Sequence, residues 1–132
     1  MELLHAYSSV VTAIGVLAVL LLVQILVVDV LGIRAKHVPG SQVPTDHDNP
    51  LFRASRVVGN TNEGIALFIL AVLFCVFSGA SPSLTSYAVW TYVVARFLFA
   101  LCYYFNQQTL RSTMFGASLL AMIALVLIGF FG

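Results

Sequence analysis

Charged and polar side chains recur at helical spacing in the stretch Arg53-Ala-Ser-Arg56-Val-Val-Gly-Asn60-Thr-Asn-Glu63, which continues without a helix breaker into the apolar segment 65–77. Intervals of three, four and three residues place the long polar side chains on one face of a helix. A charge near the middle of a bilayer costs about 2.5–3.5 kcal/mol even on a lenient insertion scale. We therefore expect the rest of the chain to enclose this polar face, which consists of Arg53, Arg56, Asn60 and Glu63.

The composition is that of an integral membrane protein. Of 132 residues, 61% are hydrophobic and only 8% are charged, whereas soluble domains average about 45–50% apolar and about 25% charged residues. A net charge of +1 gives no indication of the basic surface that nucleic-acid-binding proteins carry. The length fits one small bundle, so we predict a single all-α membrane domain with four transmembrane helices over residues 1–132.

Breaks in the apolar pattern divide the chain into four segments, each near the roughly 20 residues that a bilayer requires. The segment 32–49 is rich in proline, glycine and charged residues, and is therefore predicted to be the one long loop, with a possible role as part of a lid. Asn49 and Pro50 are typical of a helix start, and 78–83 is typical of a turn. The predicted helices cover about residues 7–31, 50–77, 84–107 and 109–130.

Basic residues gather at one end of the predicted bundle. Arg34 and Lys36 lie in the long loop and Arg111 follows the last connection, whereas the opposite end carries only Glu2. By the positive-inside rule, the loop and the polar face lie on the cytoplasmic side and both termini on the other side. The N-terminus lacks the basic region of a signal peptide, so we expect the first helix to be retained.

Cysteine and histidine residues give no indication of a metal site. Cys75 and Cys102 lie inside apolar segments, without metal-ligand spacing, and are expected to be buried free thiols. His37 and His47 lie in the loop without a ligand partner at a metal-like interval. No metal cofactor is therefore predicted.

A second polar face is predicted on the third helix, at intervals of three, four and four residues: Arg96, Phe99, Tyr103 and Gln107. Arg96 lies about midway along its apolar segment, too deep to be an interface anchor. We therefore predict that Arg96 is buried as the partner of Glu63 or of an anionic ligand.

The membrane part of the chain carries more positive than negative charge. Buried arginines in excess of carboxylates favour an anionic ligand. A structural network of interhelical hydrogen bonds, worth about 0.6–2 kcal/mol each, is the alternative. The arginines in question are Arg53, Arg56, Arg96 and Arg111, against Glu63 and, near a helix end, Asp29.

These residues resemble the signature of the MAPEG family, the membrane-associated proteins in eicosanoid and glutathione metabolism. The second helix of the family carries an arginine, an asparagine four residues later and a glutamate three further on, and Arg56, Asn60 and Glu63 match this register. The resemblance covers nearly the whole chain, including the four-helix plan and the long first loop. Further matches are Ala95-Arg96 and Tyr103-Tyr104 on the third helix, and Leu110-Arg111-Ser112 at the start of the fourth.

The resemblance implies a homotrimer that binds glutathione as the thiolate between neighbouring subunits. A free thiol has a pKa of about 8.5, so an adjacent arginine would raise the thiolate fraction at neutral pH. A hydrophobic small molecule or lipid would enter from the membrane as the second substrate. The implied catalytic residues are Arg111 and Ser112, and the implied glutathione-binding residues are Arg34, Arg53, Arg56, Asn60, Glu63, Arg96, Tyr103 and Gln107.

The sequence also departs from part of the family. Gly64 and Phe99 stand where leukotriene-synthase-like members have tyrosines, and the proline usual soon after the glutamate is absent. The resemblance therefore implies a general glutathione transferase or peroxidase, active on lipophilic electrophiles or lipid hydroperoxides. The compact chain is similar to bacterial members, which implies a bacterial inner membrane.

Two other functions are compatible with four helices. A non-catalytic lipid-binding protein of the same fold is the first, although the retained Arg111 and the intact Arg-Asn-Glu register favour an enzyme. A small multidrug exporter is the second, but such proteins carry their proton-coupling glutamate in the first helix, where this chain has none at mid-depth. The glutathione-dependent enzyme is therefore the preferred hypothesis.

Overall fold

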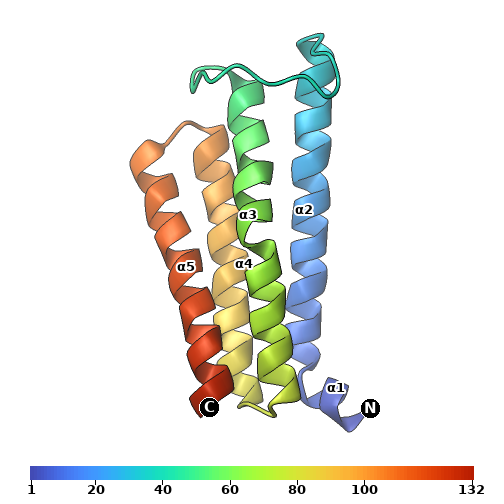
Figure 1. The fold of residues 1–132 in the computed structure, drawn as a ribbon, viewed down its shortest axis with the longest axis vertical. Coiled ribbons are helices and arrows are strands. Elements are labelled where there is room, and N and C mark those ends of the chain that lie inside the picture. The colour runs from blue at the N-terminus through green and yellow to red at the C-terminus, as the bar shows by residue number, and fades with distance from the viewer.

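The computed structural model describes residues 1–132 as an antiparallel bundle of four long helices without strands (Figure 1). All four are long and apolar enough to cross a membrane, so the predicted fold class, an all-α integral membrane bundle, is confirmed. A short helix, α1 (Glu2–Ala6), comes first and was not predicted. The long helices are α2 (Ser8–Arg34), α3 (Pro50–Phe77), α4 (Pro82–Tyr104) and α5 (Gln108–Phe131).

Helix caps explain where α3 and α4 begin. The side chains of Asn49 and Ser81 each accept a hydrogen bond from a backbone N–H of the first turn, and each is followed by a proline. Because Ser81 is the cap, α4 begins at Pro82, slightly earlier than predicted. It also ends earlier, at Tyr104, since Asn106 has a positive φ of 58° and turns the chain towards α5.

The two middle helices hold the bundle together. α4 packs against α2, α3 and α5, and α3 also contacts α2 and α5, so that α2 and α5 form opposite edges (Figure 1). The larger buried cluster lies towards the termini, where the rings of Phe68 and Tyr92 stack 3.9 Å apart. In lipid such contacts stabilise the bundle through close packing. A smaller cluster near the long loop consists of Val57, Phe99, Ala100 and Tyr103.

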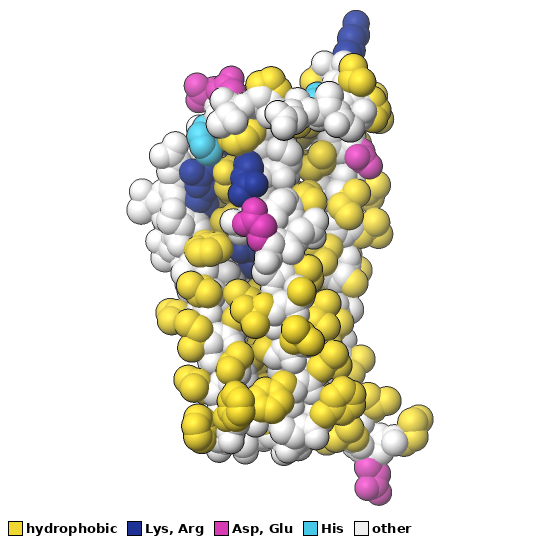
Figure 2. All heavy atoms as spheres, viewed as in Figure 1, with side chains coloured by type: hydrophobic (Ala, Val, Ile, Leu, Met, Phe, Trp, Pro, Cys, Tyr) yellow, Lys and Arg dark blue, Asp and Glu magenta, His cyan; other side chains and the backbone are white.

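The surface divides along the long axis of the bundle. Figure 2 shows hydrophobic side chains over the lower part of the visible face, whereas most basic and acidic side chains lie in its upper part, within and below the long loop, with one acidic side chain at the opposite end. The cysteines differ in burial: Cys75 is buried and donates to the Leu125 carbonyl at 3.0 Å, whereas Cys102 is only partly buried, contrary to expectation. The charged side chains that could form a functional site are therefore concentrated at the loop end of the bundle.

Gln24, on α2, is 1% exposed, and neither its Oε1 nor its Nε2 has a hydrogen-bond partner in the protein. A buried polar group without a partner costs about 1–3 kcal/mol. We expect Gln24→Leu, of similar volume, to raise the melting temperature in detergent, measured by circular dichroism. Val23→Leu, at the exposed neighbouring position, is the control. An unchanged or lower melting temperature for Gln24→Leu would show that the amide is satisfied.

Candidate functional site

A cavity of about 240 Å³ lies between α3, α4 and α5 near the loop end of the bundle. Two guanidinium groups, an amide and two hydroxyls line it together with aromatic rings. The predicted catalytic residues thus meet three of the predicted binding residues around one space, although they come from three different helices. The lining residues are Arg56, Asn60, Phe99, Tyr103, Arg111, Ser112 and Phe115.

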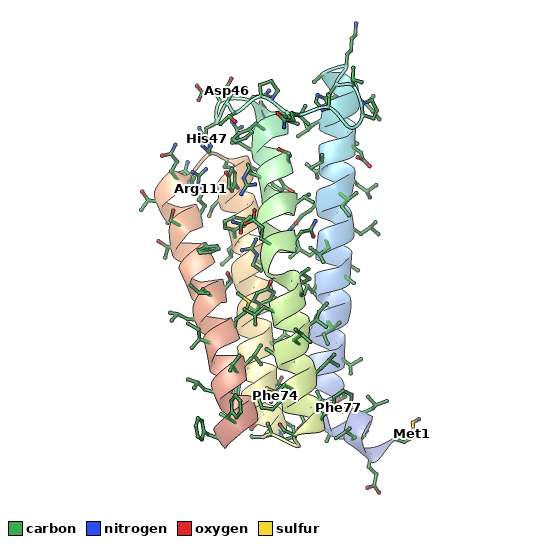
Figure 3. All side chains as sticks on the ribbon, viewed as in Figure 1. Met1, Asp46, His47, Phe74, Phe77 and Arg111 are labelled. Carbon is green, nitrogen blue, oxygen red and sulfur yellow. The ribbon has the colours of Figure 1, made fainter.

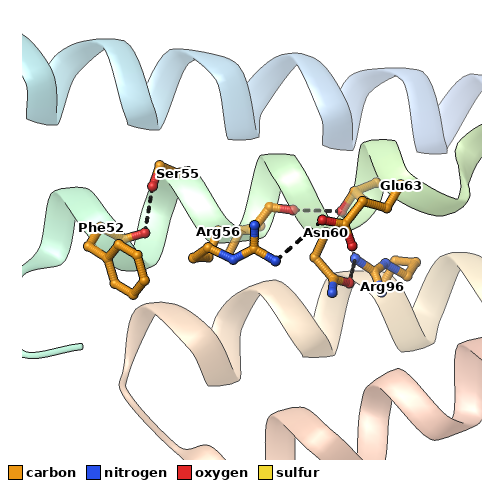
Figure 4. Close-up of polar contacts among 8 residues, drawn as sticks. Phe52, Ser55, Arg56, Asn60, Glu63 and Arg96 are labelled. Carbon is orange, nitrogen blue, oxygen red and sulfur yellow. Dashed lines mark hydrogen bonds and ion pairs between the residues drawn. The ribbon is translucent and has the colours of Figure 1, made fainter. Parts of the chain in front are cut away.

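Arg56 carries the only ion pair of the chain. Its Nη2 lies 3.4 Å from Oε1 of Glu63, two turns further along α3 (Figure 4). The side chains are 39% and 64% exposed, so a single chain leaves this pair at its surface. Pairs with this exposure contribute little to stability, about 0–1 kcal/mol in water. The predicted enclosure of the polar face is therefore incomplete within a single chain.

Arg96 is the deeply buried charge of the site, at 3% exposure. Its Nη2 donates to Oδ1 of Asn60 at 2.9 Å and to Oγ1 of Thr61 at 2.8 Å, and its guanidinium lies 4.1 Å from the ring centre of Phe99. Arg96 is buried, as predicted, but within one chain it does not pair with Glu63, and the alternative partner, an anionic ligand, stays a prediction. The reason is that Thr61 lies on the buried side of α3, whereas Glu63 lies on the exposed side with Arg56.

The bond from Arg96 also orients Asn60. A guanidinium can only donate, so the amide oxygen of Asn60 must face Arg96. The Nδ2 group of Asn60 then remains available as a donor in the cavity that Asn60 lines. Arg96 itself does not line the cavity, but it orients the amide group of Asn60, which does.

Arg111, in the first turn of α5, lies against two aromatic rings. Its guanidinium carbon is 4.3 Å from the ring centre of Tyr103, and its Nη1 is 3.5 Å from Nδ1 of His47 in the long loop. Figure 3 shows His47 and Arg111 side by side at this end of the bundle. A guanidinium over the face of a tyrosine gains about 0.5–2 kcal/mol. Arg111 is thus held at the cavity by α4 and by the loop.

The sequence model of the MAPEG family matches residues 10–131, which include nearly all of the four long helices. The chain belongs to the MAPEG family. No curated protein and no solved structure matches it. Family membership supports a membrane protein with a role in glutathione-related or eicosanoid metabolism.

Five predicted site residues of this MAPEG chain do not line the cavity: Arg34, Arg53, Glu63, Arg96 and Gln107. Arg53 donates through Nη1 to the His47 carbonyl at 2.7 Å and through Nε to the Tyr104 carbonyl at 3.3 Å, so it ties the loop to the end of α4. Arg34, the last residue of α2, is exposed. In a single chain, therefore, neither Arg53 nor Arg34 lines the space around Arg111.

Gln107 does not share the helical face predicted for it. Because α4 ends at Tyr104, Gln107 lies in the connection to α5, where its Nε2 is 3.5 Å from the Phe105 carbonyl. Ser112 does line the cavity, although its Oγ donates to the Gln108 carbonyl within its own helix at 3.1 Å. The predicted face of α4 thus consists of Arg96, Phe99 and Tyr103 alone.

Three residues that line the cavity or contact Arg96 or Arg111 were not assigned to the site from the sequence: His47, Thr61 and Phe115. Thr61 follows Asn60 directly, and its burial beside Arg96 depends on how α3 and α4 pack. From the sequence, His47 was weighed only as a metal ligand. Residue spacing gives no indication that this loop residue contacts the start of α5. Phe115 lies one helical turn after Arg111, and this i, i+4 interval was the available signal.

Two apolar grooves lie on the outer surface of the bundle, and one of them adjoins the site. One, of about 430 Å³, runs between α4 and α5. Ala95, one of its lining residues, directly precedes Arg96, and Met114 precedes Phe115 of the cavity, so this groove lies next to the polar site. Another apolar groove, of about 250 Å³, lies between α2 and α3. The first groove is lined by Tyr87, Trp90, Thr91, Val94, Ala95, Leu98, Met114 and Ala117.

Proposed function

We propose that this MAPEG protein is a glutathione-dependent transferase or peroxidase that acts on lipophilic electrophiles or lipid hydroperoxides. The observation that carries the proposal is that Arg56, Asn60, Arg111 and Ser112 line one cavity. Glutathione has two carboxylates, one ammonium and one thiol. Two arginines with one adjacent carboxylate, Glu63, complement these charges.

Arg111 is the proposed activator of the thiol. Because a free thiol titrates near pH ~8.5, most of it is protonated at neutral pH, and an adjacent guanidinium stabilises the thiolate. The thiolate sulfur then forms a bond to the electrophilic carbon as the leaving group departs with its electron pair. With a hydroperoxide, the sulfur attacks the terminal oxygen, the O–O bond breaks, and the alkoxide takes up a proton and leaves as the alcohol. The thiol of a second glutathione then attacks the resulting glutathione sulfenic acid, which gives the disulfide and water. Neither route needs a covalent enzyme intermediate.

Ser112 and Asn60 are the proposed hydrogen-bond donors to bound glutathione. The amide Nδ2 of Asn60 is free because Arg96 holds the amide oxygen. The Ser112 hydroxyl needs only a rotation about χ1 to leave the Gln108 carbonyl and reach the cavity. Tyr103 contributes its ring beneath Arg111.

Assembly with further copies would complete the site. The Arg56–Glu63 pair is exposed within a helix that is apolar enough to span a membrane, and exposure of charges to lipid is costly. The cavity of one chain, about 240 Å³, is also below the roughly 300–1,000 Å³ of sites that enclose small ligands. We therefore propose that glutathione binds between subunits of a homotrimer, where Arg34 of an adjacent subunit reaches the site.

The proposed orientation places the loop end in the cytoplasm, since Arg34 and Lys36 lie there. The lipophilic substrate would enter along the apolar groove between α4 and α5, which adjoins the polar cavity. The two substrates would then meet at the membrane boundary. A bacterial inner membrane is the proposed location, because the compact chain resembles bacterial members of the family.

The test is an activity assay of the protein reconstituted in lipid vesicles. We expect glutathione-dependent conjugation of a lipophilic aryl halide, or glutathione-dependent reduction of a lipid hydroperoxide, well above the uncatalysed rate. Vesicles without protein are the control. Absence of both activities, together with binding of a lipophilic ligand that glutathione does not affect, would contradict the proposal and support a non-catalytic lipid-binding protein of the same fold.

A further inference from the structure

His47 is a half-buried loop residue whose side chain contacts the polar site. Its ring centre lies 5.0 Å from that of Phe52 in an edge-on arrangement and 6.3 Å from that of Tyr103 in a stacked one. Its Nδ1 lies 3.5 Å from Nη1 of Arg111 (Figure 3). The imidazole therefore touches the first turn of α3, the end of α4 and the start of α5.

The backbone around His47 is held in place by specific hydrogen bonds. Arg53 donates to the His47 carbonyl at 2.7 Å and to the Tyr104 carbonyl at 3.3 Å. The backbone N–H of Asp48 donates to Oδ1 of Asp46 at 3.0 Å, and Asn49 caps α3. These hydrogen bonds fix this end of the loop to α3 and α4. The fold therefore determines where the imidazole of His47 lies.

The contact with Arg111 indicates which ring nitrogen of His47 is the acceptor. A guanidinium only donates, so Nδ1 of His47 must accept, and the ring proton must lie on Nε2. An imidazolium would lose this acceptor and would add a positive charge beside Arg111. The other charged groups near His47 are Arg53, which bonds to its carbonyl, and the flanking carboxylates of Asp46 and Asp48.

We propose that His47 is a positioning residue, which holds the Arg111 guanidinium at the cavity together with the ring of Tyr103. The proposal rests on the proposed function of the cavity. Tyr103 supports one face of the guanidinium and His47 accepts from one of its edges. Together, α4 and the loop then direct the remaining N–H groups of Arg111 towards the sulfur of bound glutathione. The loop thereby becomes part of the catalytic machinery.

Three substitutions separate hydrogen bonding from packing. His47→Phe keeps an aromatic ring and removes the acceptor, whereas His47→Asn keeps an amide near the position of Nδ1. His37→Phe is the matched control, because His37 lies in the same loop and bonds only to Ser41. The measurements are kcat and KM for glutathione, and the pH titration of the thiolate absorbance of bound glutathione in the reconstituted full-length protein.

For His47→Phe we expect kcat to fall about three- to tenfold, the effect of losing one hydrogen bond, with KM for glutathione changed less than about twofold. The thiolate titration should move to higher pH, because a displaced guanidinium stabilises the thiolate less. His47→Asn should recover most of the loss, and His37→Phe should behave as the parent.

The outcomes distinguish the two proposals. If the parent binds glutathione as the thiolate and His47→Phe has the parental kcat and titration, the positioning role of His47 is wrong while the proposed function stands. If the parent shows no thiolate, the proposed function and the role of His47 both fail. Should His47→Phe not fold, as judged by circular dichroism, His47→Gln takes its place, since its amide lies near the position of Nε2 and the same loss is expected.

Discussion

Replacing Arg111 by alanine is expected to lower kcat for glutathione conjugation by about 10²–10³-fold, the usual effect of removing a donor aimed at developing negative charge. KM for glutathione should change far less, because Arg56 and Asn60 remain in the cavity to bind the peptide. Steady-state kinetics in lipid vesicles measure both parameters. The thiolate absorbance of bound glutathione should fall in parallel with kcat.

Thr113→Ala is the matched control for this experiment. Thr113 lies on the same helix two residues further on, is exposed, and donates only to the carbonyl of Thr109. Its replacement should leave kinetics and thiolate absorbance at the parental values. Equal turnover in Arg111→Ala and the parent would contradict the catalytic role of Arg111, whatever the effect on binding.

Arg56→Ala is expected to weaken glutathione binding by about 10–100-fold, because one charge-assisted hydrogen bond is worth about 1.5–3 kcal/mol. The substitution also leaves Glu63 without its ion-pair partner, so an unpaired carboxylate would repel the carboxylates of glutathione. Isothermal titration calorimetry in detergent measures the affinity. At saturating glutathione, kcat should remain near the parental value, since Arg111 is untouched.

Ser55→Ala controls for local effects on α3. Ser55 precedes Arg56 and donates to the Phe52 carbonyl within its own helix, as Figure 4 shows. Its replacement should leave glutathione affinity unchanged. A parental affinity in Arg56→Ala would mean that the cavity between α3 and α5 is not where glutathione binds.

The fold was predictable from local signals. Apolar runs of membrane-spanning length identify the four long helices, and the Asn49-Pro50 cap and the 78–83 turn delimit α3. The meeting of Arg56, Asn60 and Arg111 was anticipated only through the resemblance to MAPEG proteins. Helical spacing places Arg56 and Asn60 on one face, but it does not bring α5 to them.

The contacts that could not be predicted from the sequence depend on how the helices pack and on where the backbone turns. Arg96 bonds to Asn60 and Thr61 instead of Glu63 because the rotation of α3 in the bundle decides which side chains face α4. Gln107 leaves the predicted face because a positive φ at Asn106 ends the helical path. His47 reaches Arg111 through tertiary contacts of a loop, for which periodicity carries no information.

The most direct test of the central claim is an ultraviolet difference titration of glutathione into the detergent-solubilised protein at neutral pH, with calorimetry in parallel. We predict a saturable thiolate band and a matching heat of binding, because Arg111 and Arg56 line one cavity. No thiolate band and no heat would contradict this account, and the polar residues of α3 would then serve a different anion or a structural network.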